Sequence, residues 1–244
     1  MIAAIIQARM GSSRLPNKVL MDIDGKPSLK FMIDRVKKSK RVEKIIVATT
    51  TDKRDKVIVE FCVKNNILFY SGSENDVLDR YYNASKKNNI KTIVRLTSDC
   101  PLIDPDLIDK TIDLYFDKAV NYAANAVPPE LKKYPDGSDV EVFSFKDLTR
   151  AWNESDDIQD REHVTFYFWK RNQDFKTAML KNNYDWGKYR ITVDYKEDLK
   201  LVRKIAEILK VQNKFGYTHE IIEILKENKE LFDINSMHTW GSNW

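Results

Sequence analysis

The feature that most constrains the fold is a regular alternation of short apolar runs with amphipathic stretches in the first half of the chain. The strand-like runs lie at 2–6, 44–50, 67–72, 92–99 and 120–125. The helix-like stretches lie near 27–39, 54–65, 75–88 and 105–118. Strands that are apolar on both faces are typical of a parallel sheet covered on both sides by helices. The sequence therefore predicts an α/β protein, a three-layer α/β/α sandwich around a mostly parallel sheet.

The second half is less regular but continues without a low-complexity linker. A polar, proline-bearing loop follows residue 126. Strands are predicted at 140–145, near 174–181 and at 189–194, and helices near 146–154, 160–171, 196–210 and 218–228. We therefore expect one domain over 1–244, with 127–244 closing over a site formed by 1–126. The aromatic stretch 231–244 lacks periodicity and is interpreted as either a packed tail or a frayed end.

Composition excludes several classes of function. The 41 basic and 37 acidic side chains are spread along the chain, so the net charge of +4 does not indicate a nucleic-acid footprint. No apolar run approaches the ~20 residues of a membrane span, and no leader precedes the first strand, so we expect a cytoplasmic protein. Cys62 and Cys100 are expected to be free thiols. The three dispersed histidines favour neither a zinc site nor a Ser-His-Asp triad.

The loop after the first apolar run combines small residues with fixed positive charge. Gly11, Ser12 and Ser13 allow backbone N–H groups to approach anionic oxygens, and Arg14 and Lys18 supply cations. This pattern is typical of a cradle for a nucleoside triphosphate. The alternative is a glycine turn with solvated basic residues.

Two aspartates are candidates for metal binding. Asp99 follows the run at 92–98 and Asp194 follows the run at 189–193, so both carboxylates should project from the carboxyl ends of strands into one crevice. Mg²⁺ prefers one or two carboxylates together with phosphate oxygens, which suits a bound triphosphate. The alternative for each aspartate is a helix N-cap, because a helix is predicted after both.

Six segments in order carry a resemblance to a known family: QARMGSSRLPNKVL, GSENDVLDRYY, RLTSDCPLID, YPDGSDVEVF, REHVTFYF and RITVDYKEDL. Together they resemble the spore coat polysaccharide biosynthesis protein F family. That family is similar to the cytidylyltransferases that activate 3-deoxy-manno-octulosonate and acylneuraminate, which share a nucleotide-diphospho-sugar transferase fold. The resemblance implies transfer of CMP from CTP to an acceptor, with release of pyrophosphate, by a homodimer.

The resemblance also implies roles for particular residues. Arg14 and Lys18 would neutralise charge on the leaving pyrophosphate, and Asp99 with Asp194 would hold Mg²⁺. The nucleotide would be held by Ala8, Arg9, Gly11, Ser12, Ser13, Ser71, Gly72, Arg80 and Ser98. Arg80 has an open alternative, a surface ion pair with Asp76 one helical turn earlier.

The acceptor pocket is expected to be polar. Its candidate residues are Asp136, Gly137, Asp139, Glu141, Arg161, His163 and Arg190. Five of these seven residues have a structural alternative. Asp139 and Glu141 fit a strand whose charges face solvent, His163 fits a core or capping histidine, and the two arginines fit ion pairs with nearby aspartates.

Two Asp-x-Asp triplets leave a different enzyme class open. Residues 22–24 and 104–106 have the spacing with which glycosyltransferases hold a metal and a nucleotide-sugar, although a turn and a helix start account for them. A glycosyltransferase and a non-catalytic nucleotide-binding subunit therefore remain alternatives. The acceptor is not fixed by sequence, and the preference for cytosine rests on the resemblance.

Overall fold

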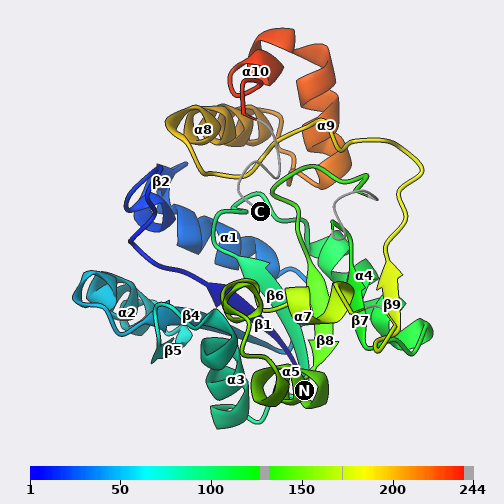
Figure 1. Ribbon diagram of the computed structural model, residues 1–244. Helices are drawn as coiled ribbons and strands as arrows, with labels where there is room; N and C mark the ends of the chain where they lie inside the picture. Colours follow the sequence, from blue (N-terminus) through cyan, green and yellow to red (C-terminus); the bar gives the residue numbers. More distant parts are fainter. Residues whose placement is uncertain (127–131, 172, 239–244) are drawn as a thin grey trace.

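The computed structural model describes residues 1–126, 132–171 and 173–238, and its centre is a seven-stranded sheet (Figure 1). The strand order is β5-β4-β1-β6-β8-β7-β9. The strands are β1 (Ile2–Gln7), β4 (Lys44–Thr50), β5 (Leu68–Gly72), β6 (Thr92–Thr97), β7 (Tyr122–Ala124), β8 (Glu141–Ser144) and β9 (Thr177–Met179). Only β8 runs antiparallel to its neighbours, β6 and β7. The prediction of a mostly parallel sheet is confirmed.

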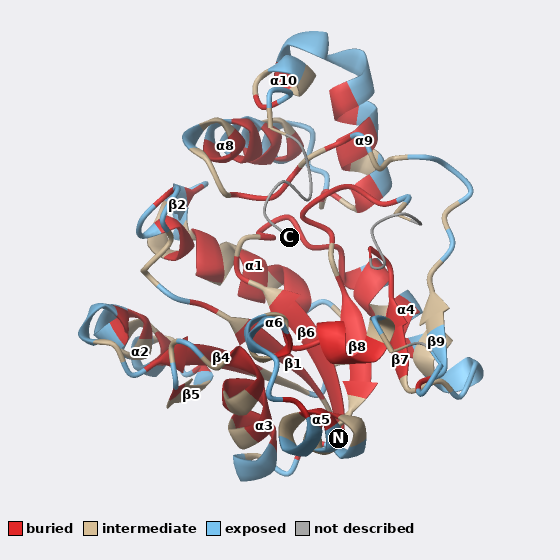
Figure 2. Ribbon diagram, viewed as in Figure 1, coloured by how far each residue is buried: buried red, intermediate tan, exposed pale blue. Residues whose placement is uncertain are grey.

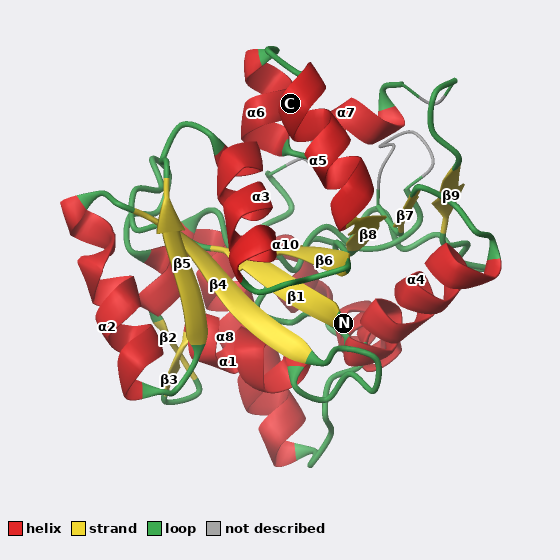
Figure 3. Cartoon of the chain, turned by 90° about the horizontal axis from the view of Figure 1, so that it is seen from below, coloured by secondary structure: helices red, strands yellow, loops and turns green. Residues whose placement is uncertain are grey.

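Helices cover both faces of this sheet (Figure 3). They are α1 (Ser28–Val36), α2 (Lys56–Lys64), α3 (Val77–Lys87), α4 (Pro105–Asp117), α5 (Phe145–Glu154), α6 (Ile158–His163), α7 (Phe166–Trp169), α8 (Lys196–Val211), α9 (Thr218–Glu227) and α10 (Lys229–Asp233). Short 3-10 turns lie at η1 (Lys18–Leu20) and η2 (Lys53–Asp55), and a two-stranded hairpin is formed by β2 (Asp22–Ile23) and β3 (Lys26–Pro27).

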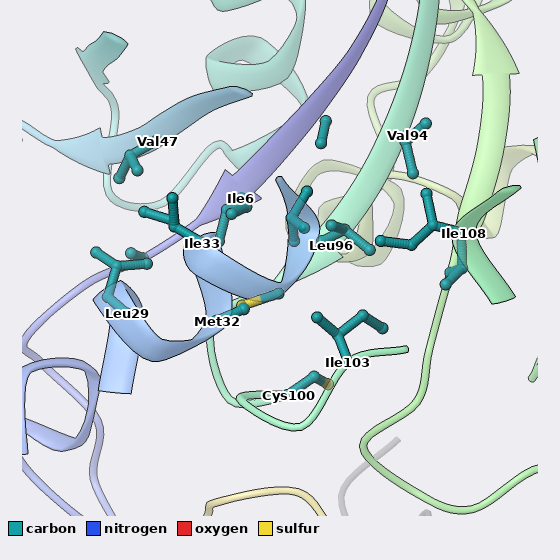
Figure 4. Packing of buried hydrophobic residues seen from close by; sticks show 14 of the residues in the cluster. Ile6, Leu29, Met32, Ile33, Val47, Val94, Leu96, Cys100, Ile103 and Ile108 are labelled. Atoms are coloured by element: carbon teal, nitrogen blue, oxygen red, sulfur yellow. The ribbon is translucent and has the colours of Figure 1, made fainter. Parts of the chain in front are cut away.

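Successive side chains of a strand point to opposite faces of the sheet, so the core is divided into two layers. From β1, Ile6 packs with side chains of α1 and α4 on one face, as Figure 4 shows around Met32 and Ile108. Ile5 packs on the opposite face with α3, α5 and α7. Since β1 and β4 bury apolar side chains on both faces, their burial requires helices on both sides of the sheet, and the three-layer prediction is confirmed.

A third apolar cluster lies beyond the carboxyl ends of the strands. Helices α8, α9 and α10 pack there on Leu15, from the loop after β1, and Leu102, from the loop after β6. In Figure 2 these helices are buried on their inner sides and exposed on their outer sides. The last helices thus cover the edge of the sheet at which the candidate residues emerge.

Three details differ from the sequence prediction. Residues 189–194 are not a strand: the segment has one isolated bridge, Asp136 with Arg190, and Val193 binds the loop after β6 by a hydrogen bond to the Asp99 carbonyl. The helix predicted at 160–171 is divided into α6 and α7 at Val164, whose φ of 62° and ψ of −56° form a γ-turn closed by a hydrogen bond from the Thr165 N–H to the His163 carbonyl. Helix α10 was not predicted, and the aromatic tail is packed at Leu231, while 239–244 lie outside the described residues.

Cys62 and Cys100 are buried and unbonded to each other, as predicted. Among the described residues, no helix has the length and apolarity needed to span a membrane.

Candidate active site

A cavity of about 750 Å³ opens at the carboxyl ends of β1 and β6. Its lining comes from six separate segments of the chain, at 7–19, 74–80, 95–100, 136–141, 158–163 and 190–195. The ends of neighbouring parallel strands are where α/β sheets bind ligands. The fold therefore collects at one place most of the residues that the sequence singled out.

Lys18 lies at the point where the distant segments meet. Its Nζ donates to Asp194 Oδ1 at 2.7 Å, to the Val193 carbonyl at 2.8 Å and to Asp99 Oδ2 at 3.3 Å. Burial lowers the pKa of this ammonium, but the two carboxylates outweigh burial, and the pKa is raised above its usual value. Lys18 therefore stays charged between the two aspartates.

Asp194 is surrounded by cations. Arg14 Nη2 lies 2.9 Å and Arg190 Nη2 lies 3.4 Å from its Oδ2. Burial alone would raise the pKa of Asp194, yet Lys18 and Arg14 lower it to about 2. The carboxylate is therefore ionised at neutral pH, as a metal ligand must be.

Neither metal candidate is a helix N-cap, so that alternative is wrong. Asp104 is the N-cap of α4, and Tyr195 is the N-cap of α8. Asp99 precedes the cap of α4 by five positions, and the segment that carries Asp194 is held against it because Val193 N–H donates to the Asp99 carbonyl at 2.8 Å. The two carboxylates are thus joined through both Lys18 and the backbone.

The donor set fits a hard divalent cation. Two carboxylates converge on one point, and no group of three or more His, Cys, Asp or Glu side chains suited to a metal occurs among the residues that the structure describes. Mg²⁺ is usually held by one or two carboxylates, with substrate phosphates and water completing its octahedron. Asp99 and Asp194 would supply the protein's share.

The predicted nucleotide residues are only partly brought to the cavity. Its lining includes Ala8, Arg9, Ser12, Ser13, Arg14, Arg80 and Ser98 but not Gly11, Ser71 or Gly72. A Cβ at Gly72 would lie 2.9 Å from the Tyr70 ring, and one at Gly11 would lie 3.2 Å from the Arg54 guanidinium. At both positions these neighbours leave little room for a side chain, which accounts for the glycine.

Arg80 is buried, and the surface ion pair with Asp76 is wrong. Its guanidinium lies 3.3 Å from the Glu74 carbonyl and 3.5 Å from the Ala48 carbonyl. Asp76 is instead paired with Arg161, at 3.3 Å. The buried guanidinium forms part of the cavity wall next to Glu74.

The cavity lining also includes five of the seven predicted acceptor residues: Asp136, Asp139, Glu141, His163 and Arg190. Arg161 and Gly137 do not line the cavity. The Arg161 guanidinium donates to the carbonyls of Ser155 at 2.9 Å and Trp152 at 3.0 Å besides its pair with Asp76, which is the structural role that the sequence left open.

The acceptor side is lined by groups that are already partnered. Glu141 is buried, forms an ion pair with Arg95 and accepts from the Tyr122 hydroxyl, so a solvent-facing position for Glu141 is wrong. Arg190 is paired with Asp136. The His163 ring stacks on Phe166 at 4.3 Å, and burial lowers the pKa of the imidazole, which leaves it neutral at pH 7.

Arg95 and Tyr195 are among the lining residues that sequence reasoning missed. Arg95 lies within an otherwise apolar strand, and a charge at such a position was a usable signal. Tyr195 follows Asp194 directly; its ring stacks on His238 at 3.8 Å, and the Arg14 guanidinium lies 5.3 Å from its centre. Tyr195 and His238 are 43 positions apart, and no local pattern in the sequence predicts that their rings stack.

Comparison with known proteins identifies the family. A family model described as "Cytidylyltransferase" matches residues 3–237. The chain belongs to the cytidylyltransferase family. This confirms the resemblance found in the motifs and makes the protein a nucleotidyltransferase.

Similar proteins span nearly the whole chain. An uncharacterized protein of Methanocaldococcus jannaschii, MJ1063, is 38% identical over 240 residues, covering 96% of this chain and 94% of its own. The spore coat polysaccharide biosynthesis protein SpsF of Bacillus subtilis is 32% identical over 215 residues, covering 84% and 86%. A solved cytidylyltransferase from Leptospira borgpetersenii has a TM-score of 0.87 and 32% identity, covering 95% and 96%.

Proposed function

We propose that this cytidylyltransferase moves CMP from CTP to an oxygen of a sugar, a sugar acid or a phosphorylated small molecule, with Mg²⁺ as cofactor. The observation that carries the proposal is the Lys18 ammonium, which lies within 3.3 Å of both Asp99 and Asp194. A polyphosphate with a divalent cation needs fixed positive and negative groups around one point, and here both kinds are present.

In the proposed reaction, a hydroxyl or phosphate oxygen of the acceptor bonds to the α-phosphorus of CTP. The bond from the α-phosphorus to the bridging oxygen breaks, pyrophosphate leaves, and a hydroxyl acceptor loses its proton to solvent. Lys18 and Arg14 would neutralise the charge that develops on the pyrophosphate. Catalysis would consist mainly of positioning and electrostatic stabilisation.

When bound, Mg²⁺ would supply Lewis-acid stabilisation of the negative charge on the phosphates. Asp99 and Asp194 would hold it, and the cationic neighbours of Asp194 keep that carboxylate ionised. The backbone contact from Val193 to Asp99 would maintain the separation of the two ligands. The loop at 8–14 would bind the phosphates, with Arg80 and Ser98 on the nucleotide side.

The acceptor would enter on the side of Glu141 and His163. Neutral imidazole, carboxylate and hydroxyl groups suit a ligand with many hydroxyls. The name of the Bacillus subtilis relative places it in spore coat polysaccharide biosynthesis, which supports a role in supplying activated precursors for a surface glycan. A cytoplasmic location and a homodimer belong to the same proposal.

Two alternatives are less well supported. Of the Asp-x-Asp triplets that suggested a glycosyltransferase, residues 22–24 lie in the β2–β3 hairpin, and Asp104 caps α4 by accepting from the Asp106 N–H; neither triplet lines the cavity. A non-catalytic nucleotide-binding subunit would have no need for the charged cluster formed by Arg14, Lys18, Asp99 and Asp194.

The experiment is a screen for pyrophosphate release. CTP, UTP, ATP and GTP are each incubated with Mg²⁺ and a panel of sugar acids, sugar phosphates and phosphorylated small molecules. The proposal expects pyrophosphate from CTP with one acceptor class and none in EDTA. Nucleoside diphosphate formed from a nucleotide-sugar would favour the glycosyltransferase, and CTP binding without turnover would favour the non-catalytic subunit.

A further inference from the structure

Behind Asp194 lies a second carboxylate that does not reach the cavity. Asp198 has no exposed surface, and it is absent from the cavity lining. Its two oxygens accept five hydrogen bonds. Two come from the Arg190 guanidinium, each at 2.9 Å, and the others come from the N–H groups of Asp194 and Tyr195 and from the side-chain amide of Asn235. A buried carboxylate needs this degree of saturation to be stable.

Asp198 controls the direction of Asp194 in two ways. The N–H groups of Asp194 and Tyr195 both donate to Asp198 Oδ2, at 2.9 and 3.0 Å, which fixes the backbone on either side of the Asp194 carbonyl. Arg190 also reaches the Asp194 side chain, at 3.4 Å. The orientation of the candidate metal ligand therefore depends on how Asp198 and Arg190 are held.

Asn235 forms hydrogen bonds with both Asp198 and Arg190. Its Nδ2 donates to Asp198 Oδ1 at 2.8 Å and to the Arg190 carbonyl at 3.2 Å. The residue is 4% exposed and follows α10, which is fixed to the third apolar cluster through Leu231. Asn235 does not line the cavity, and both hydrogen bonds of its side-chain amide go to the residues behind Asp194.

We propose that Asn235 is a positioning residue: acting through Asp198 and Arg190, it orients the Asp194 carboxylate and thereby sets the affinity of the site for the divalent cation that accompanies the nucleotide. Hydrogen-bonding partners behind ligating carboxylates orient them, and their loss typically lowers metal affinity or activity by about 10- to 100-fold. The inference rests on the proposed function, because it assumes that Asp194 is a ligand. It gives the segment after α10 a role in the reaction.

The test uses Mn²⁺ as a spectroscopic substitute for Mg²⁺. Free Mn²⁺ is titrated by electron paramagnetic resonance against the full chain with saturating CTP and no acceptor, for wild type and for Asn235→Leu. Leucine is close to asparagine in size but donates no hydrogen bond. We expect the Mn²⁺ dissociation constant to rise about tenfold, and the Mg²⁺ concentration that half-saturates pyrophosphate release to rise by a similar factor. The smaller variant Asn235→Ala is measured in parallel and is expected to show the same shift.

The matched control is Asn228→Ala at the junction of α9 and α10. The Asn228 side-chain amide donates to the Ile224 carbonyl at 2.8 Å, and it is not among the hydrogen-bonding partners of Asp198. We expect this variant to lower the melting temperature while Mn²⁺ binding stays at the wild-type value. The inference would be overturned if a folded Asn235 variant bound Mn²⁺ with wild-type affinity. It would also be overturned if Asn228→Ala lost as much Mn²⁺ affinity as the Asn235 variants. Failure of the wild type to bind Mn²⁺ with CTP would overturn the proposed function itself, so the two failures are distinguishable.

Discussion

At the scale of single residues, Lys18 has the largest expected effect on turnover. Lys18→Ala removes the ammonium from between Asp99 and Asp194 and is expected to lower the rate of pyrophosphate release at least a hundredfold. A fixed donor at a developing oxyanion contributes about 2.7 to 4 kcal/mol, which corresponds to a factor of that size or larger. Lys26→Ala is the control, because its ammonium is half-exposed and pairs with Asp34 on the surface. Near-normal turnover in Lys18→Ala would remove Lys18 from the mechanism.

Asp194 gives a pH dependence at the same scale. Its pKa is about 2 in the folded protein and 3.8 ordinarily, so its contribution to stability is complete above pH 3.8 and is lost as the pH falls toward 2. The contribution is about 2 kcal/mol. Urea unfolding measured from pH 5 to 2 should therefore show a shallower loss of stability in Asp194→Asn than in wild type. Parallel pH profiles would contradict the assigned ion pairs with Lys18 and Arg14.

At the scale of elements, the turn at 136–139 packs directly against the segment at 190–194, which carries Asp194. Gly137 has a φ of +95°, and a Cβ there would lie 2.3 Å from the Thr192 nitrogen. Gly137→Ala is therefore expected to lower the free energy of unfolding by about 3 kcal/mol or more. It should also weaken CTP binding, because Thr192 lies close to Asp194. Gly25→Ala is the matched control: its φ is +77°, nothing lies within 4 Å, and we expect a cost of about 1 kcal/mol. Equal melting temperatures for the two variants would show that the contact is not tight.

The elements also show what sequence periodicity can and cannot predict. The strand at 44–50 and the helix after Pro105 were predicted within a residue or two, because burial on both faces and an N-terminal proline leave strong local signals. The run at 189–194 was predicted as a strand and is not one. The alternation of apolar and polar residues predicts which side chains are buried. It does not predict whether the backbone pairs with a neighbouring strand, because that strand lies far along the chain.

The same distinction applies to the site. Asp99 was placed correctly at the end of a strand from sequence, because the carboxyl edge of a parallel sheet is where side chains converge on a ligand. Asp194 reaches the same cavity although its flanking segment is not in the sheet. Asn235 could not be predicted from sequence, because its contacts to Asp198 and Arg190 cross 37 and 45 positions without a local pattern.

At the scale of the whole molecule, the cavity draws its walls from both 1–126 and 127–244, with Lys18 in the first part and Asp194 in the second. A ligand that contacts both parts should stabilise the fold as one unit. Binding to the folded state alone adds about 2.7 kcal/mol at a hundredfold excess over the dissociation constant, which is a rise of about 5 to 10 °C for a protein of this length.

That stabilisation should require CTP and Mg²⁺ together. The phosphates of CTP carry several negative charges, and without a metal ion they would face the carboxyl groups of Asp99 and Asp194 across a partly buried cavity, where repulsion is screened less than in water. We therefore expect a large rise in melting temperature with CTP and Mg²⁺, and a small one with CTP in EDTA or with Mg²⁺ alone. Thermal denaturation followed by circular dichroism measures each condition. An equal rise with CTP in EDTA would mean that the carboxylates do not meet the phosphates through a metal, because the predicted repulsion would then be missing.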